Sequence, residues 1–287
     1  MKKIILLLCL FSSLESYAQH SCCVKPGSAS LAFADLSNDP AFVASHLSPL
    51  PLEFEPKIGK MVSLKTADGK EGRAFEVRAG QGLGKVIILF HEWWGLNDYI
   101  KREAERIFSE TGFTVLAIDL YDGKVASNPD SAAAYMQDMK EARVKNIIQA
   151  AIEYAGEQGK IQTIGWCMGG TWSLQAAMMA REHCVGCVMF YGMPEKDLEK
   201  IKIFNAPVLG FFGSKDKWIT PAVVNEFDAT MKKEGKKFTF QEFDADHAFA
   251  NPSNPKYNKV AAEEAHVKAI AFIKEHFQQA FIPPGQH

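Results

Sequence analysis

A glycine-rich segment, Gly165-Trp166-Cys167-Met168-Gly169-Gly170, lies between an apolar run at 161–164 and a helix-compatible run at 171–181. This pattern is typical of a sharp strand-to-helix turn with a nucleophile at its centre, here a cysteine where a serine is usual. Gly165 and Gly169 permit close backbone packing around the turn. The following helix directs its free N–H groups at Cys167, which favours a thiolate or an oxyanion. The alternative is a small buried cysteine on a tight turn.

Apolar runs of strand length alternate with helical patterns over most of the chain. The first two expected strands flank a turn at Asp68-Gly69. The alternation predicts an α/β fold, with a mostly parallel twisted sheet, helices on both faces, and ligands bound beyond the carboxyl ends of the strands. The expected strands are 61–66, 73–77, 86–90, 113–118, 161–164, 184–191, 207–213 and 238–243, and the expected helices include 129–154, 171–181, 221–233 and 257–277.

The first 18 residues have the pattern of a secretory signal peptide. A basic start at 1–3 precedes an apolar run at 4–11 and a small-x-small cleavage site at Ser16-Tyr17-Ala18. The apolar run is shorter than a membrane span. We therefore expect a secreted or periplasmic protein without stable membrane insertion. The alternatives are an uncleaved anchor and lipidation at Cys22.

The remainder divides into an extension and one domain. Residues 19–56 are rich in Ser, Ala, Pro and Asn, and four prolines interrupt any long element, so we expect a partly ordered N-terminal extension there. A single domain is expected at 57–280. The net charge of −2 and the pI near 6.5, with no cluster of Lys or Arg, give no indication of a nucleic-acid partner.

The chain has six cysteines, five of them after the signal segment. The odd number means that one thiol stays free or pairs between chains, and a free Cys167 fits. The segment Cys184-Val185-Gly186-Cys187 has C-x-x-C spacing but opens an apolar strand, so packing is favoured over a redox motif or half of a zinc site. No two further ligands follow at zinc spacing. We expect neither a metal nor an organic cofactor.

Two more candidates follow expected strands. Asp216 comes just after 207–213, and His247 just after 238–243. With Cys167 they give the chain order nucleophile, acid, histidine, which is that of α/β-hydrolases. A thiolate attacks, an imidazole transfers its proton, and a carboxylate fixes the imidazole tautomer. Taken singly, both residues are ordinary turn or loop residues, and Asp244 and Asp246 are rival carboxylates.

Glu92 is the fourth candidate. It follows the strand at 86–90 within His91-Glu92-Trp93-Trp94-Gly95. The alternative is a carboxylate at a helix start or in a solvated turn. The pair His91-Glu92 is not a zinc motif, because no second histidine follows at helical spacing.

Together these segments resemble the dienelactone hydrolase family of α/β-hydrolases, in order and over 60–277. The resemblance implies a triad of Cys167 as nucleophile, His247 as base and acid, and Asp216 as orienting acid. It also implies that Glu92 contacts the resting thiol and helps to activate it when substrate arrives. The matching segments are His91-Glu92-Trp93-Trp94-Gly95, Asp119-Leu120-Tyr121, Gly165–Gly170, Tyr191-Gly192, Gly213-Ser214-Lys215-Asp216 and His247-Ala248-Phe249.

The resemblance further implies an oxyanion hole made by the backbone N–H groups of Trp93 and Met168. Tyr135 resembles a substrate-pocket tyrosine of the family. Trp94 and Asn251 are the other expected substrate contacts, and the tryptophans near the strand ends suggest an aromatic-lined pocket.

Two departures bear on the substrate. The family has arginines that grip a substrate carboxylate, and Ser131 and Asn251 stand in their places. Neither replaces a bidentate arginine, so dienelactone itself is not the expected substrate, and a signal peptide is unexpected for an enzyme of that pathway. We expect a monomeric hydrolase of small carboxylic esters or lactones that works through a thioester acyl-enzyme. A peptidase or acyltransferase on the same scaffold, and a non-catalytic binding protein, are the alternatives.

Overall fold

The computed structural model describes residues 28–78, 80 and 84–280, so the expected signal peptide, Cys22 and Cys23 lie outside the described residues. All of the expected strands form, with ends shifted by one or two residues in most cases. The strands are β1 (Lys60–Lys65), β2 (Glu71–Val77), β3 (Lys85–Phe90), β4 (Thr114–Ile118), β5 (Lys160–Trp166), β6 (Cys184–Phe190), β7 (Val208–Gly213) and β8 (Phe238–Phe243).

These strands form one sheet in the order β1-β2-β4-β3-β5-β6-β7-β8. The pairs β1–β2 and β2–β4 are antiparallel, and the other neighbours are parallel. The predicted mostly parallel sheet is therefore confirmed. β3 and β4 are apolar along almost their whole length because both faces of the sheet are covered.

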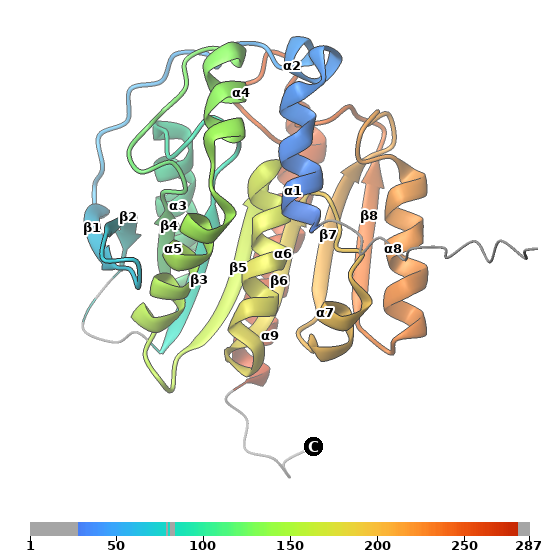
Figure 1. Cartoon of the computed structure of the whole chain (residues 1–287). Coiled ribbons are helices and arrows are strands. Elements are labelled where there is room, and N and C mark those ends of the chain that lie inside the picture. Colours follow the sequence, from blue (N-terminus) through green and yellow to red (C-terminus); the bar gives the residue numbers. More distant parts are fainter. Residues whose placement is uncertain (1–27, 79, 81–83, 281–287) are drawn as a thin grey trace, which may run out of the picture.

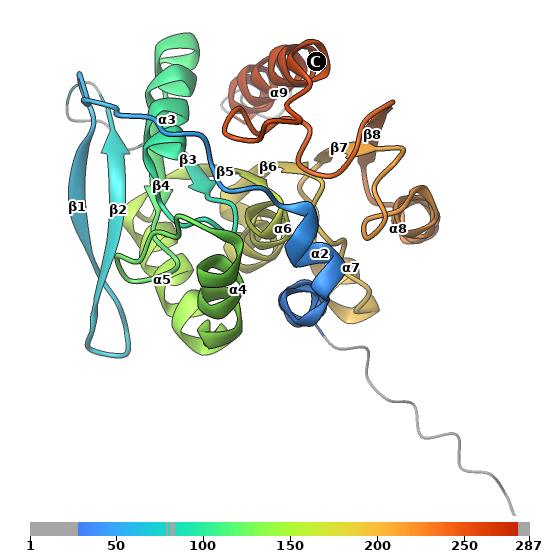
Figure 2. The same cartoon turned by 90° about the horizontal axis from the view of Figure 1, so that it is seen from above.

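Helices cover both faces, as predicted (Figure 2). The helices are α1 (Ala29–Ala34), α2 (Pro40–Ser45), α3 (Asp98–Thr111), α4 (Pro129–Asp138), α5 (Glu141–Tyr154), α6 (Met168–Ala180), α7 (Leu198–Ile203), α8 (Pro221–Lys233) and α9 (Lys259–Gln279), with short 3₁₀ turns η1 (Asp35–Asn38) and η2 (Arg181–His183). Helices α3 and α9 lie on one face, α5 and α6 lie on the other, and α8 packs beside β8. None of the described helices has the length and apolar character needed to cross a bilayer.

The expected single helix over 129–154 is wrong. Met139 and Lys140 have extended backbone conformations, with ψ of 120° and 117°, and separate α4 from α5. The two halves pack against different partners: α4 against η1 and α2, and α5 against the sheet and α6. This division of partners explains why one straight helix does not form.

The segment before the sheet packs onto the fold. Asp39 caps α2 and Pro40 begins it, an arrangement in which proline starts a helix instead of interrupting one. Phe33 and Phe42 are fully buried in the main hydrophobic core. Helix α1 lies against α6, and α2 lies close to α4 (Figure 1). The expected domain start at 57 therefore leaves out residues that the core includes.

Candidate active site

Cys167 stands at the turn between β5 and α6 in a conformation that L-residues rarely adopt, with φ of 57° and ψ of −121°. The flanking glycines are required by contact. A Cβ on Gly165 would lie 2.1 Å from the carbonyl oxygen of Gly169, and one on Gly169 would lie 2.4 Å from that of His91. The backbone N–H of Cys167 donates to the carbonyl of Phe190 at 3.0 Å. The turn is thus the strained elbow that the glycine spacing predicts.

The three residues expected to act together do meet. Nε2 of His247 lies 3.4 Å from Sγ of Cys167. On the other side of the ring, Nδ1–H of His247 donates to Oδ2 of Asp216 at 2.6 Å. The second oxygen of Asp216 accepts the backbone N–H groups of Trp218 and Ile219, each at 2.9 Å. Asp216 is therefore fixed by the loop after β7, and it fixes the imidazole in turn.

The rival carboxylates lie elsewhere. Asp244 and Asp246 are exposed, and Asp244 pairs with Lys215 at 2.9 Å. The geometry therefore selects Asp216 as the partner of His247.

Burial and charge set the protonation of the three groups. Burial alone would raise the pKa of Asp216, but the charge and hydrogen bond of His247 outweigh it and lower that pKa. Burial also opposes a charged His247, yet the charge of Asp216 raises its pKa. Burial raises the pKa of Cys167, against the opposing effect of His247. The two groups therefore share one proton between Sγ of Cys167 and Nε2 of His247, and the charge of Asp216 favours its place on the imidazole.

Glu92 is buried beside the thiol but bonds to other groups. Its carboxylate accepts the hydroxyl of Tyr191 at 3.2 Å and the side-chain amide of Asn251. Burial raises the pKa of Glu92 to about 7. Within the described part of the chain, the sulfur is bonded to His247 and not to Glu92. No hydrogen bond joins Glu92 to the thiol among the described residues, although both line the same recess, so the role that the resemblance implies for Glu92 stays a prediction.

The two residues expected to form the oxyanion hole lie close to Cys167. Met168 follows Cys167 directly and its backbone N–H lowers the pKa of that thiol, and the side chain of Met168 accepts the hydroxyl of Tyr121 at 3.3 Å. Trp93 follows Glu92 directly, is fully buried, and lines the same narrow recess as Cys167. Both residues therefore lie beside the recess, and an oxyanion hole made by their N–H groups stays a prediction.

A cavity of about 290 Å³ lies next to this recess and shares Glu92, Trp94 and Asn251 with it. Its walls are aromatic near the sheet and charged near α3 and α9. Two of the three expected substrate contacts, Trp94 and Asn251, therefore line the cavity. Further lining residues include Trp166, Phe190, Ile100, Arg106, Tyr257 and Glu263.

Tyr135 does not line this cavity or the recess. Its ring packs against Tyr121, with centroids 5.9 Å apart, and the ammonium of Lys124 lies 5.2 Å from its centre. Tyr135 thus reaches the site only through Tyr121, because α4 packs on the N-terminal segment instead of over the recess. The expected contact of Tyr135 with substrate is not supported.

The model of the dienelactone hydrolase family matches residues 74–277. The chain belongs to this family. Protein usf of Aquifex pyrophilus is 31% identical over 235 residues, covering 76% of this chain and 99% of the relative. A carboxymethylenebutenolidase of a Pseudomonas species is 26% identical over 224 residues, covering 72% and 90%.

Solved structures support the same fold. A dienelactone hydrolase-like promiscuous phosphotriesterase from metagenomic libraries superposes with a TM-score of 0.66 at 20% identity, covering 76% of this chain and 99% of that one. The architecture is thus the α/β-hydrolase fold, and the chain is a hydrolase of the dienelactone hydrolase family.

One buried residue of the site was missed by sequence reasoning. His46 follows α2, is 5% exposed, and packs at a tilt against Phe42 and Trp93, with ring centroids 4.4 Å away in both cases. Its ring centre lies 5.5 Å from that of His247. Burial, aided by the charge of His247, lowers the pKa of His46 to about 3, so it is neutral at ordinary pH. The local signal was Asp39-Pro40, a helix start that brings Phe42 and His46 onto one face.

The two cysteines of the C-x-x-C segment remain apart from this chemistry. Cys184 and Cys187 are buried and free in β6. Burial raises the pKa of Cys187 to about 11, so its thiol is neutral. Packing is the role that this arrangement favours.

Proposed function

We propose that the protein hydrolyses small carboxylic esters or lactones through a Cys167–His247–Asp216 triad and a thioester acyl-enzyme. The observation that carries the proposal is the position of His247, whose two ring nitrogens contact the sulfur and the carboxylate at once. That arrangement is what proton transfer to and from a nucleophile needs. The membership of the chain in a hydrolase family supports the same chemistry.

The steps follow from the geometry. Sγ of Cys167 attacks the substrate carbonyl carbon while Nε2 of His247 takes the thiol proton. The carbonyl oxygen gains negative charge and is stabilised by the N–H groups of Met168 and Trp93. His247 then protonates the departing alkoxide, which leaves a thioester on Cys167. A water molecule, deprotonated by His247, attacks the thioester. The acid departs and the thiol regains its proton.

The two positions at which the family holds a substrate carboxylate offer no arginine here. Asn251, at the position of a family arginine, is bonded to Glu92. Ser131, at the other position, donates to the carbonyl of Asn128 at 3.0 Å inside the first turn of α4. Arg106, in the cavity wall, is paired with Glu263 at 2.6 Å. The aromatic side of the cavity is suited to an apolar acyl or alcohol group.

The decisive experiment measures a panel of aryl esters, lactones and anilides with the wild type, Cys167→Ala and His247→Ala. We expect ester or lactone turnover in the wild type, and a loss of at least about 10³-fold in both variants. Intact-mass analysis of quenched wild type should show an acyl adduct on Cys167. Full turnover by Cys167→Ala would refute the proposal, and cleavage of anilides alone would favour a peptidase.

We also propose that the mature protein is secreted or periplasmic and begins after residue 18. The support is the pattern of the first 18 residues alone. Amino-terminal sequencing of the protein purified from its source checks this. A chain that retains Met1 inside the cytosol contradicts it.

A further inference from the structure

His46 has an unexplained polar atom. Its Nδ1–H donates to the carbonyl of Phe42 at 2.8 Å, which leaves Nε2 as the lone-pair nitrogen. That Nε2 is buried and has no hydrogen-bond partner among residues 28–78, 80 and 84–280. Buried polar atoms are nearly always partnered, because an unmade hydrogen bond costs free energy. The lone pair on Nε2 of His46 therefore calls for a partner, either a hydrogen-bond donor or a metal ion.

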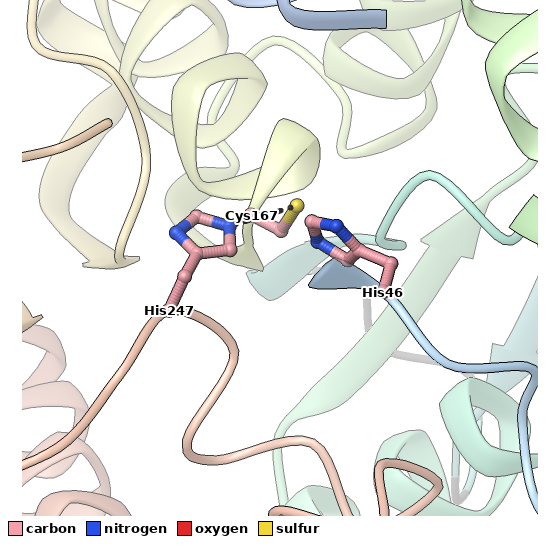
Figure 3. A group of neighbouring side chains, drawn as sticks. All are labelled: His46, Cys167 and His247. Atoms are coloured by element: carbon pink, nitrogen blue, oxygen red, sulfur yellow. Dashed lines mark hydrogen bonds between the residues drawn. The ribbon is translucent and has the colours of Figure 1, made fainter. Parts of the chain in front are cut away.

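The missing partner is indicated by what surrounds the ring. Figure 3 shows His46 and His247 on opposite sides of Cys167. One nitrogen of each imidazole and Sγ of Cys167 all lie within 4.8 Å of one another. A tetrahedral zinc ion with bonds of about 2.0–2.3 Å holds its ligand atoms about 3.3–3.6 Å apart. The three ligand atoms therefore need to approach one another by at most about 1.5 Å to share one ion.

Both histidines are also oriented as metal-binding histidines are. The Nδ1–H of His247 donates to Asp216, and that of His46 donates to a backbone carbonyl. Such bonds from the second ring nitrogen fix the tautomer and direct the lone pair of Nε2 at an ion. One thiolate and two imidazoles form a soft ligand set that suits zinc and disfavours magnesium or calcium.

We propose that Cys167, His46 and His247 form a binding site for a thiophilic cation of the zinc type. The ion replaces the single proton held between Cys167 and His247 and bonds to the sulfur and to both Nε2 atoms. Because it occupies the sulfur and the base, it blocks acyl transfer, and this inhibitory part rests on the proposed function. Because His46 belongs to the N-terminal segment, the ion also ties that segment to the core.

The test uses the untagged chain from residue 19 onward, the mature form proposed above, in a background with Cys22→Ser and Cys23→Ser, so that these thiols do not contribute. Zn²⁺ is titrated in competition with a chromophoric chelator, and Co²⁺ serves as a spectroscopic probe. We expect one Zn²⁺ per chain, a sulfur-to-cobalt charge-transfer band in the near ultraviolet, and a raised melting temperature. Magnesium should produce none of these changes.

His276→Ala is the matched control. Like His46, His276 bonds through Nδ1 to the carbonyl four residues earlier, Phe272, and stacks on that phenylalanine. We expect His46→Ala to weaken Zn²⁺ at least tenfold and His276→Ala to leave binding unchanged. His46→Gln provides a second variant if His46→Ala does not fold.

Two results would overturn the site: no cobalt–sulfur band in the wild type, or equal Zn²⁺ affinity in a folded His46 variant. The outcome is separable from that of the hydrolase proposal because binding is measured without substrate. A chain that binds Zn²⁺ but cleaves no ester keeps the site and loses the proposed function. A chain that cleaves esters but does not bind Zn²⁺ keeps the proposed function and loses the metal site.

Discussion

The side-chain amide of Asn251 donates a hydrogen bond to the carboxylate of Glu92, across 159 positions of sequence. The amide oxygen of Asn251 is used as well, since it accepts the backbone N–H and the hydroxyl of Ser253 at 2.8 and 2.7 Å. Asn251 therefore holds a carboxylate that belongs to the protein itself. The bond ties the loop after β8 to the loop after β3.

The first prediction concerns that bond. Asn251→Ala leaves one oxygen of the buried Glu92 without its donor, and an unpaired buried group costs about 1–3 kcal/mol. We expect the free energy of unfolding at neutral pH to fall by about this amount, measured by urea denaturation. Asn205→Ala is the control, because Asn205 is exposed and the only side-chain hydrogen bond it forms among the described residues comes from Lys236. Equal stability of Asn251→Ala and the control would contradict the prediction.

Glu92 itself should make stability depend on pH. Its pKa of about 7 in the fold is raised by burial above the ordinary value of 4.5. Between these values the folded state keeps a proton that the unfolded state has released. The stabilisation is therefore complete below about pH 4.5 and is lost as the pH rises to about 7.

The magnitude follows from the same shift. A difference of about 2.5 pKa units corresponds to about 3 kcal/mol. Relative to the wild type, Glu92→Gln should gain stability by about that amount between about pH 4 and pH 8, because glutamine does not titrate. Urea denaturation of both proteins at each pH measures the difference. A difference that does not change with pH would contradict the assignment.

A third prediction separates the carboxylates after β7 and β8. Asp216→Asn keeps an oxygen for the N–H groups of Trp218 and Ile219 but no longer fixes the tautomer of His247. We expect kcat on an aryl ester to fall by about 10²–10⁴-fold with the fold intact. Asp246→Asn is the control, because this exposed side chain lies in the same loop as His247. If kcat falls as much in Asp246→Asn as in Asp216→Asn, the assignment of Asp216 as the orienting acid is wrong.

The meeting of Cys167, Asp216 and His247 could be predicted because parallel strands bring their carboxyl ends to one edge of the sheet. Each residue follows a strand whose apolar run is visible in the sequence. The strand-to-helix turn at Cys167 could be predicted as well, because the glycine spacing that it requires lies within six consecutive residues.

The parts that sequence reasoning missed depend on packing between distant segments. Nothing within 29–46 shows that Phe42 packs against Trp218, with ring centroids 5.1 Å apart. The break between α4 and α5 likewise follows from their separate partners. The bonds of Glu92 to Tyr191 and Asn251 join three loops and leave no local pattern.

The last prediction tests how the N-terminal segment closes the site. Phe42 is fully buried and packs edge-on against Trp93, Trp218 and His247, at centroid distances of 5.4, 5.1 and 5.8 Å. The recess at Cys167 is too narrow for a water molecule, and His46 and Leu47 of this segment form one of its walls. Movement of the segment should therefore open a path to the sulfur. Phe42→Ala removes the ring that anchors the segment and should destabilise the protein by about 3–5 kcal/mol. We expect iodoacetamide to alkylate Cys167 at least tenfold faster in Phe42→Ala than in the wild type, measured by peptide mass spectrometry.

Two controls separate local opening from unfolding. Leu31→Ala, at a half-exposed position of α1, should leave the rate of alkylation of Cys167 unchanged. Cys187 is the internal reference, because it is fully buried in β6 and reacts only on global unfolding. If the alkylation of Cys187 speeds up as much as that of Cys167, the cause is global unfolding, and the N-terminal segment does not control access to Cys167.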